Sequence, residues 1–128
     1  MKKVLITLLF FGAINTLFAD SLKVYVIKAS KEAGAKDAGL APVQKHLNKL
    51  PFKSFSLVGN SGNVNFPAKL NQKFGDIAVN CEGPQDKLKI NVKANQKNLI
   101  NTTVKLKTRF IYSLKVNGQD IVIIVNLN

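Results

Sequence analysis

The sequence predicts an α+β fold, in which a mostly antiparallel β-sheet or sandwich of about seven to eight strands carries one short helix after the first strand. Apolar and polar residues alternate along many short segments, as expected for strands with one buried face. Clusters of Gly, Asn, Pro and Asp separate these segments, and a single segment has the apolar spacing of a helix. A partly open β-barrel with a helical plug fits the same pattern and is the alternative.

The N-terminal segment MKKVLITLLFFGAINTLFAD has the pattern of a secretory signal peptide. It begins with a positively charged Lys-Lys pair, residues 4–13 are apolar but too few to span a bilayer, and Ala19 suits a cleavage site. We therefore expect residues 1–19 to be a signal peptide and residues 20–128 to form a single β-rich globular domain, located in the periplasm or outside the cell. No later segment has the length and hydropathy of a transmembrane helix.

The first strand and the helix have clear signals. Residues 22–29 are rich in β-branched and aromatic side chains and predict a strand. Residues 40–50 predict a short helix, because their apolar side chains recur at spacings of three and four: Leu40, Val43, Leu47 and Leu50. Pro42 is acceptable in the first turn of that helix, and Pro51 ends it.

The rest of the chain predicts strands joined by turns. The expected strands are residues 52–58, 64–66, 69–74, 77–81, 86–98 and 102–107. The cluster GNSGN, residues 59–63, has no following Lys-Ser/Thr pair or helix, so we expect a hairpin turn rather than a phosphate-binding loop. The cluster EGPQ, residues 82–85, predicts another turn.

The last two strands have the best-defined register. Residues 109–116 and 119–127 flank an Asn-Gly pair, which suits the positive φ angles of a two-residue type I′ turn. That turn predicts three apolar pairs on one face, Leu114 with Ile121, Tyr112 with Ile123 and Phe110 with Val125. On the other face it sets Lys115 opposite Asp120. We expect this hairpin to be central in the sheet, with the helix covering one of its faces.

The sequence nominates no catalytic group. His46 is the single histidine and Cys81 the single cysteine, and no third orienting residue or family signature supports a Cys–His dyad. Cys81 can be a buried inert thiol or an exposed thiol that pairs between chains; we expect it to be buried and no internal disulfide to form. The scattered carboxylates show no metal-ligand spacing, so we expect no metal and no cofactor.

The charge is strongly basic. The net charge of the whole chain is +12, and removal of the two lysines in the signal segment lowers it to +10. Arg109 is the only arginine, and the other basic residues are lysines. Lysines act as point charges, whereas bidentate hydrogen bonding to phosphate or guanine favours arginine. The composition therefore predicts an acidic partner rather than sequence-specific binding to nucleic acid.

One segment concentrates this charge. In residues 87–93 three lysines and Asn91 alternate with apolar residues, and Lys105 and Lys107 alternate with apolar residues in the next predicted strand. The candidate basic patch is Lys87, Lys89, Lys93, Lys105, Lys107 and Arg109. A three-residue loop at 96–98 would set Lys89 opposite Lys105 and Lys87 opposite Lys107, a repulsive arrangement that an anionic partner would relieve. The simpler interpretation is a solvated lysine face that keeps the protein soluble and blocks edge-to-edge aggregation.

The run KDAGLAPVQKHLNKLPFKSFSLVGN, followed by a lysine-rich β meander, resembles small exported bacterial proteins of unknown function. In those proteins a short helix precedes a strand of the form F-x-S-[FY]-x-L. The resemblance implies a β-rich exported domain and carries over no catalytic residue. We expect an exported, non-enzymatic binding or assembly module of the cell envelope, with an acidic envelope protein or an anionic polymer as partner. The alternative is a small secreted hydrolase or inhibitor with a loop-borne site.

Overall fold

A computed structural model of the protein describes residues 21–34 and 37–128. The predicted signal peptide lies outside these residues. Within them the chain forms nine strands in two antiparallel sheets, with one short helical segment after the first strand. The predicted mostly antiparallel sandwich is therefore confirmed, and the two sheets do not close into a barrel. In the described part of the chain, no helix is long and apolar enough to cross a membrane.

The first sheet, here called the covered sheet, has the strand order β3-β2-β10-β9, and β4 also pairs with β2. Its strands are β2 (Ser21–Ser30), β3 (Ser54–Asn60), β4 (Val64–Asn65), β9 (Arg109–Val116) and β10 (Gln119–Leu127). The second sheet, here called the open sheet, has the order β5-β6-β7-β8. Its strands are β5 (Ala68–Phe74), β6 (Ile77–Gly83), β7 (Leu88–Ala94) and β8 (Lys97–Val104), and the 3-10 turn η3 (Gln85–Lys87) precedes β7.

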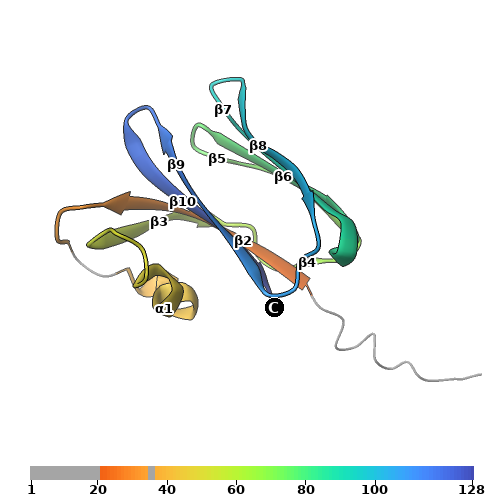
Figure 1. Ribbon diagram of the computed structural model, residues 1–128, viewed down its shortest axis with the longest axis horizontal. Coiled ribbons are helices and arrows are strands. Elements are labelled where there is room, and N and C mark those ends of the chain that lie inside the picture. The colour runs from red at the N-terminus through yellow and green to blue at the C-terminus, as the bar shows by residue number, and fades with distance from the viewer. Residues whose placement is uncertain (1–20, 35–36) are drawn as a thin grey trace, which may run out of the picture.

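The two sheets face one another across the main core, while the helical segment lies on the far side of the covered sheet (Figure 1). Each strand of the open sheet sends alternate apolar side chains inward, and β2 and β10 supply the opposing layer. The fully buried members of this core include Leu22, Val24, Val26, Val79, Cys81, Leu88, Ile90, Val92, Ile123 and Val125. Burial of this apolar surface holds the two sheets together.

The predicted helix is confirmed on the outer face of the covered sheet. It consists of the 3-10 turn η2 (Ala38–Val43), which contains Pro42, and the short helix α1 (Gln44–Leu47). Its predicted stripe packs on that face: Leu40, Val43 and Leu47 are at most 1% exposed. The helical segment ends at Leu47, before the predicted end at residue 50.

Asp37 fixes the start of this segment. Its carboxylate accepts hydrogen bonds from the backbone N–H groups of Gly39 and Leu57, both at 2.9 Å. These two bonds lower the pKa of the Asp37 carboxyl, with the bond from Leu57 contributing most. Because Leu57 belongs to β3, the same side chain both caps η2 and ties it to the covered sheet.

The C-terminal hairpin has the predicted register. Leu114 pairs with Ile121, Tyr112 with Ile123 and Phe110 with Val125, and Lys115 lies 3.9 Å from the Asp120 carboxylate across the other face. Asn117 and Gly118 have φ angles of 54° and 79°, as a type I′ turn requires. Only β10 is central, however, because β9 forms an edge of the covered sheet.

The GNSGN cluster is not a hairpin turn, which corrects the prediction. Gly59 and Asn60 end β3, residues 61–63 separate β3 from β4, and both strands pair antiparallel with β2. Residues 61–63 are therefore an interruption within one edge of the covered sheet. Ser61 bridges the interruption: its N–H donates to the Val24 carbonyl, and its hydroxyl accepts from the Val24 N–H, both at 2.9 Å. A sequence pattern cannot distinguish this arrangement from a turn, because both need small polar residues.

Candidate functional site

The register of β7 with β8 places the predicted lysines differently from expectation. The connecting turn is Asn95–Gln96, with φ angles of 52° and 66°, rather than the three-residue loop at 96–98. The pairing shifts by one residue after Val92, which leaves Leu99 as an extra residue in β8. The three-residue loop was predicted because an odd number of residues lets the apolar rows of both strands face the core. A two-residue turn plus a one-residue bulge has the same effect.

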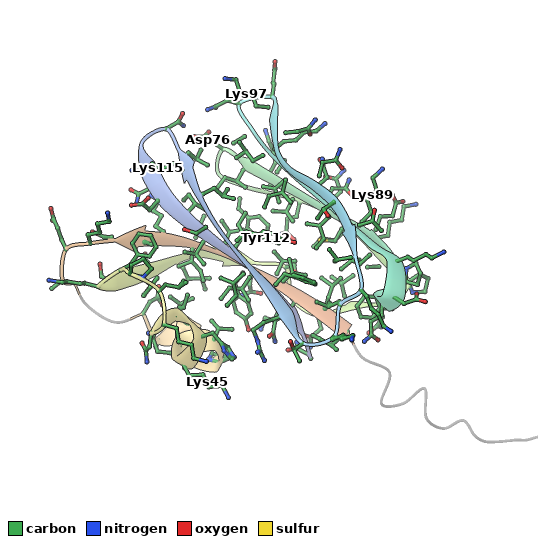
Figure 2. All side chains as sticks on the ribbon, viewed as in Figure 1. Lys45, Asp76, Lys89, Lys97, Tyr112 and Lys115 are labelled. Atoms are coloured by element: carbon green, nitrogen blue, oxygen red, sulfur yellow. The ribbon has the colours of Figure 1, made fainter. Side chains whose placement is uncertain are left out.

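The predicted pairs of like charges are therefore wrong. Lys89 faces Thr103 and Lys93 faces Asn98, whereas Lys105 lies beyond the end of β8. Of the six predicted patch residues, only Lys89 and Lys93 lie on the outer face of the open sheet. Figure 2 shows Lys89 on that outer face, with Tyr112 between the sheets and Lys45 on the helical segment.

The other four predicted residues lie at one end of the sandwich or in the covered sheet. Lys87 ends η3, and Lys105 and Lys107 flank the buried Leu106 in the segment after β8. Two hydrogen bonds of 2.9 Å join η3 to this segment, from the Leu106 N–H to the Gln85 carbonyl and from the Gln85 amide to the Leu106 carbonyl. Arg109 begins β9, and its Nε donates to Asn126 Oδ1 at 3.3 Å.

The structure adds two lysines that sequence reasoning missed. Lys69 and Lys73 lie on β5, with Glu82 opposite Lys69 and Ala78 opposite Lys73 on β6. On the far side of β6, Glu82 pairs with Lys89 and Ala78 with Lys93. Lysines of β5 and β7 therefore occupy the same two cross-strand rows. The alternation of lysine with Leu70 and Phe74 was a signal for β5, but its position beside β6 and β7 depends on the register.

Between the two lysine rows lies a row made entirely of asparagines. Each strand of the open sheet contributes one member, and each member is paired with the next across the sheet. We call this set the asparagine row: Asn71, Asn80, Asn91 and Asn101. With the four lysines and Glu82, Asn98 and Thr103, it forms a surface that we call the polar face.

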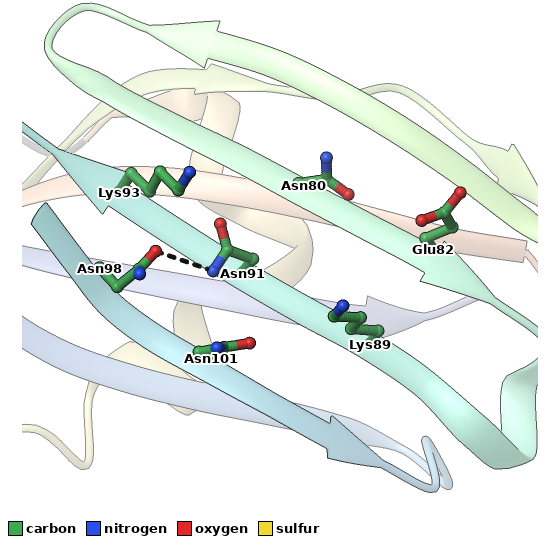
Figure 3. Close-up of a pocket in the computed structure, with 7 residues that line it drawn as sticks. All are labelled: Asn80, Glu82, Lys89, Asn91, Lys93, Asn98 and Asn101. Atoms are coloured by element: carbon green, nitrogen blue, oxygen red, sulfur yellow. Dashed lines mark hydrogen bonds between the residues drawn. The ribbon is translucent and has the colours of Figure 1, made fainter. Parts of the chain in front are cut away.

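The polar face is shallowly hollowed over β6, β7 and β8 (Figure 3). A hollow of about 320 Å³ is lined by Asn80, Glu82, Lys89, Asn91, Lys93, Asn98 and Asn101. Inside it the Asn91 amide donates to Asn98 Oδ1 at 3.1 Å and to the Ile100 carbonyl at 3.3 Å. In the described residues the only ion pair within 4.0 Å is Lys115–Asp120, so no lysine of the polar face forms an ion pair, although Glu82 lies between Lys69 and Lys89.

A second hollow, of about 300 Å³, opens between the sheets at the end that holds the β5–β6 and β9–β10 turns. Its walls are mainly apolar, formed by Val58, Phe74, Ile77, Val116 and Ile121. Lys28 and Asp76 are its charged groups, and they come from different elements. This hollow is separate from the polar face, because it lies against the inward-facing side chains of both sheets.

The two residues considered for a catalytic dyad are far from one another in the fold. Cys81 is fully buried between the sheets, and burial raises the pKa of its thiol to about 12. His46 belongs to α1, on the opposite side of the covered sheet. A Cys–His dyad is therefore excluded by the layering. Among residues 21–34 and 37–128, no group of three His, Cys, Asp or Glu side chains could hold a metal ion.

No family model, curated protein or solved structure matches the chain. The interpretation of the polar face therefore depends on the geometry and chemistry of this chain alone. That geometry provides charge and hydrogen-bonding groups on an exposed sheet surface, an arrangement suited to noncovalent binding of an extended ligand.

Proposed function

We propose that the protein is an exported, non-enzymatic binding module of the cell envelope, and that its polar face binds an anionic polymer. The observation that carries this proposal is the frame of exposed lysines on one sheet surface: Lys69, Lys73, Lys89 and Lys93. The four lysines flank β6 on one solvent-facing surface, where Glu82 is the one carboxylate among them, so the surface carries a net positive charge that attracts an anion able to bridge them.

The spacing of the lysines favours a polymer over a small ion. Lys69 and Lys73 are four residues apart on one strand, a separation of about 13 Å along the sheet. Strands β5 and β7 have β6 between them, so the two columns of lysines are about 10 Å apart. A small anion reaches one or two of these charges, whereas an extended chain can contact all four.

Protection against aggregation explains only part of this pattern. Lysines protect exposed sheet edges, and β5 is an edge of the open sheet. Strand β7, however, is an interior strand, with β6 on one side and β8 on the other. Lys89 and Lys93 therefore guard no edge, while β8, the other edge, has one lysine, Lys97, at its start and Asn101 and Thr103 on its outer side.

The predicted signal peptide supports export, and the basic charge that remains after its removal suits an environment of anionic envelope polymers. Lysine rather than arginine predominates, which favours binding to a line of charges over bidentate binding to a single phosphate or carboxylate group. The proposal accordingly includes no sequence-specific binding to nucleic acid.

The test replaces all four lysines of the frame with Gln and measures binding to heparin and to polyphosphate at several salt concentrations. A matched variant replaces four exposed lysines that lie off the polar face, Lys31, Lys45, Lys49 and Lys53, and so has the same net charge. We expect the frame variant to elute from heparin at clearly lower salt than the matched variant. Its log–log salt slope on polyphosphate should fall by about 0.7–0.9 for each lost phosphate contact.

Equal shifts in the two variants would show that only net charge matters and would overturn the proposal. An unchanged frame variant would also overturn it, and the hollow between the sheets would then be the next candidate site. Both variants should melt at the wild-type temperature or slightly above it, because their lysines are exposed and a lower net positive charge reduces self-repulsion of the folded protein.

A further inference from the structure

The asparagine row is not accounted for by folding or by charge. Asparagine is among the residues least suited to strand interiors, yet every strand of the open sheet places one at the same level. Among the described residues, Asn91 is the only member whose side-chain amide makes hydrogen bonds. The amides of Asn71, Asn80 and Asn101 therefore remain available to a ligand.

We propose that the polymer bound by the polar face is an acidic polysaccharide, whose hydroxyl groups bind the asparagine row and whose carboxylates bind the flanking lysines. This inference rests on the proposed function and specifies the class of polymer. It predicts that the asparagines and the lysines make separable contributions to binding, which the proposed function alone does not.

The chemistry of the amide favours hydroxyl groups. An asparagine side chain offers both hydrogen-bond donors and an acceptor oxygen. Phosphate and sulfate groups that are fully ionised accept hydrogen bonds and donate none, so they use only the donor half of each amide. A sugar hydroxyl both donates and accepts, and it can satisfy the amide nitrogen and the amide oxygen together.

The spacing of the row fits a sugar chain laid across the strands. Neighbouring strands are about 4.8 Å apart, which is comparable to the length of one sugar ring along an extended polysaccharide. Each ring can therefore lie over one asparagine. The lysine rows are two residues away on either side, about 6.6 Å along the strands, which is within reach of a lysine side chain.

The absence of aromatic side chains from the polar face indicates an acidic rather than a neutral sugar. Neutral sugars are commonly held by stacking on exposed rings, and the outward positions of β5 to β8 hold Lys, Asn, Glu, Ala, Thr and the bulged Leu99. Binding must then come from charge and hydrogen bonds. Lysines on both sides of the row supply the charge.

The experiment compares binding to a polyuronate, to polyphosphate and to a neutral glucan at one fixed salt concentration. The test variant replaces Asn71, Asn80 and Asn101 with Ala. The matched variant replaces three asparagines elsewhere, Asn48, Asn63 and Asn128, with Ala. We expect the test variant to lose at least about tenfold in affinity for polyuronate, the effect of losing a few hydrogen bonds, and at most about twofold for polyphosphate. The matched variant should change neither affinity.

Several outcomes would overturn the inference: an equal loss for both polymers, no loss for polyuronate, wild-type protein that prefers polyphosphate, or equally tight binding to a neutral glucan. In each case, loss of binding in the lysine-frame variant would still support the proposed function. If the lysine-frame variant binds polyuronate as wild type does, the proposed function itself fails. Should the triple variant prove unfolded by circular dichroism, the double replacement of the exposed Asn71 and Asn101 replaces it, with the same selective loss expected.

Discussion

The covered sheet and the open sheet share one core but differ on their outer faces. The outer face of the covered sheet bears Tyr25, Ile27, Val122 and Ile124, all at most 2% exposed beneath the helical segment. The outer face of the open sheet bears lysines and asparagines that no element of the described chain covers. A face that is apolar and covered serves stability, so the uncovered polar face is where a ligand can bind without disturbing the fold.

The sequence encodes this difference in the pattern of apolar residues along the strands of the two sheets. The central strand of the covered sheet contains the continuous apolar run IVIIV, which is typical of a strand buried on both faces. Strand β7 reads LKINVKA, with the strict alternation of a strand buried on one face. Only the covered sheet therefore has an apolar outer face, and the apolar stripe of the helical segment packs on that face.

The largest effect on stability is expected at Leu47, which is fully buried between the helical segment and the covered sheet. Leu47→Ala should lower the free energy of unfolding by about 2–5 kcal/mol, because it removes apolar contacts and leaves a cavity. Asn101→Ala on the polar face should change it by at most about 0.5 kcal/mol. Urea unfolding followed by circular dichroism measures both. Similar small losses in the two variants would show that the helical segment does not contribute to the core.

A second prediction compares the two sides of β6 through thiol reactivity. Cys81 faces the core with its thiol pKa raised to about 12, whereas the neighbouring Asn80 faces outward on the polar face. In Asn80→Cys, the thiol at position 80 should react with a disulfide reagent at pH 8 at least about 100-fold faster than Cys81, because thiolate fraction and access both favour it.

The measurement is the time course of thiol labelling in native protein and in denaturant. Two well-separated phases are expected in native Asn80→Cys, and the wild type should show only the slow phase. In denaturant both thiols should react at similar rates. Fast labelling of Cys81 in native wild type would mean that the core between the sheets is open to solvent.

Local signals were enough to predict the C-terminal hairpin and the helical segment. The Asn117-Gly118 turn fixes the register of β9 and β10 within a few residues, and the stripe that includes Leu40 and Leu47 identifies the helix. The register of β7 with β8 was missed because its turn contains no glycine and because one residue, Leu99, is bulged.

The asparagine row could not be predicted for a related reason. Its members are Asn71, Asn80, Asn91 and Asn101, one from each strand, and their alignment depends on three separate registers. An error of one residue in any register moves a side chain to the opposite face of the sheet. In the sequence each asparagine looks like an isolated polar residue, so the site becomes visible only when all three pairings are known.

The smallest changes in stability are expected at two hairpin turns, the β9–β10 turn of the covered sheet and the β7–β8 turn of the open sheet. Gly118 has a φ angle of 79°, and a Cβ there would meet no atom within 4 Å, so a side chain costs energy through the backbone conformation alone. Gly118→Val should therefore lower the free energy of unfolding by about 1–3 kcal/mol. Thermal or urea unfolding measures the change, and an unaltered stability would contradict the type I′ geometry of this turn.

A substitution in the β7–β8 turn of the open sheet should change stability in the opposite direction. Gln96 has a φ angle of 66°, a conformation that costs a residue with a side chain about 1–2 kcal/mol. Gln96→Gly removes this cost but gives the unfolded chain more conformational freedom, which offsets about 0.4–1 kcal/mol of the gain. The free energy of unfolding should rise by about 0.5–1 kcal/mol in urea, with heparin binding unchanged because Gln96 lies outside the polar face. A loss of stability would mean that the Asn95–Gln96 turn and the bulge at Leu99 do not set the register that aligns the asparagine row.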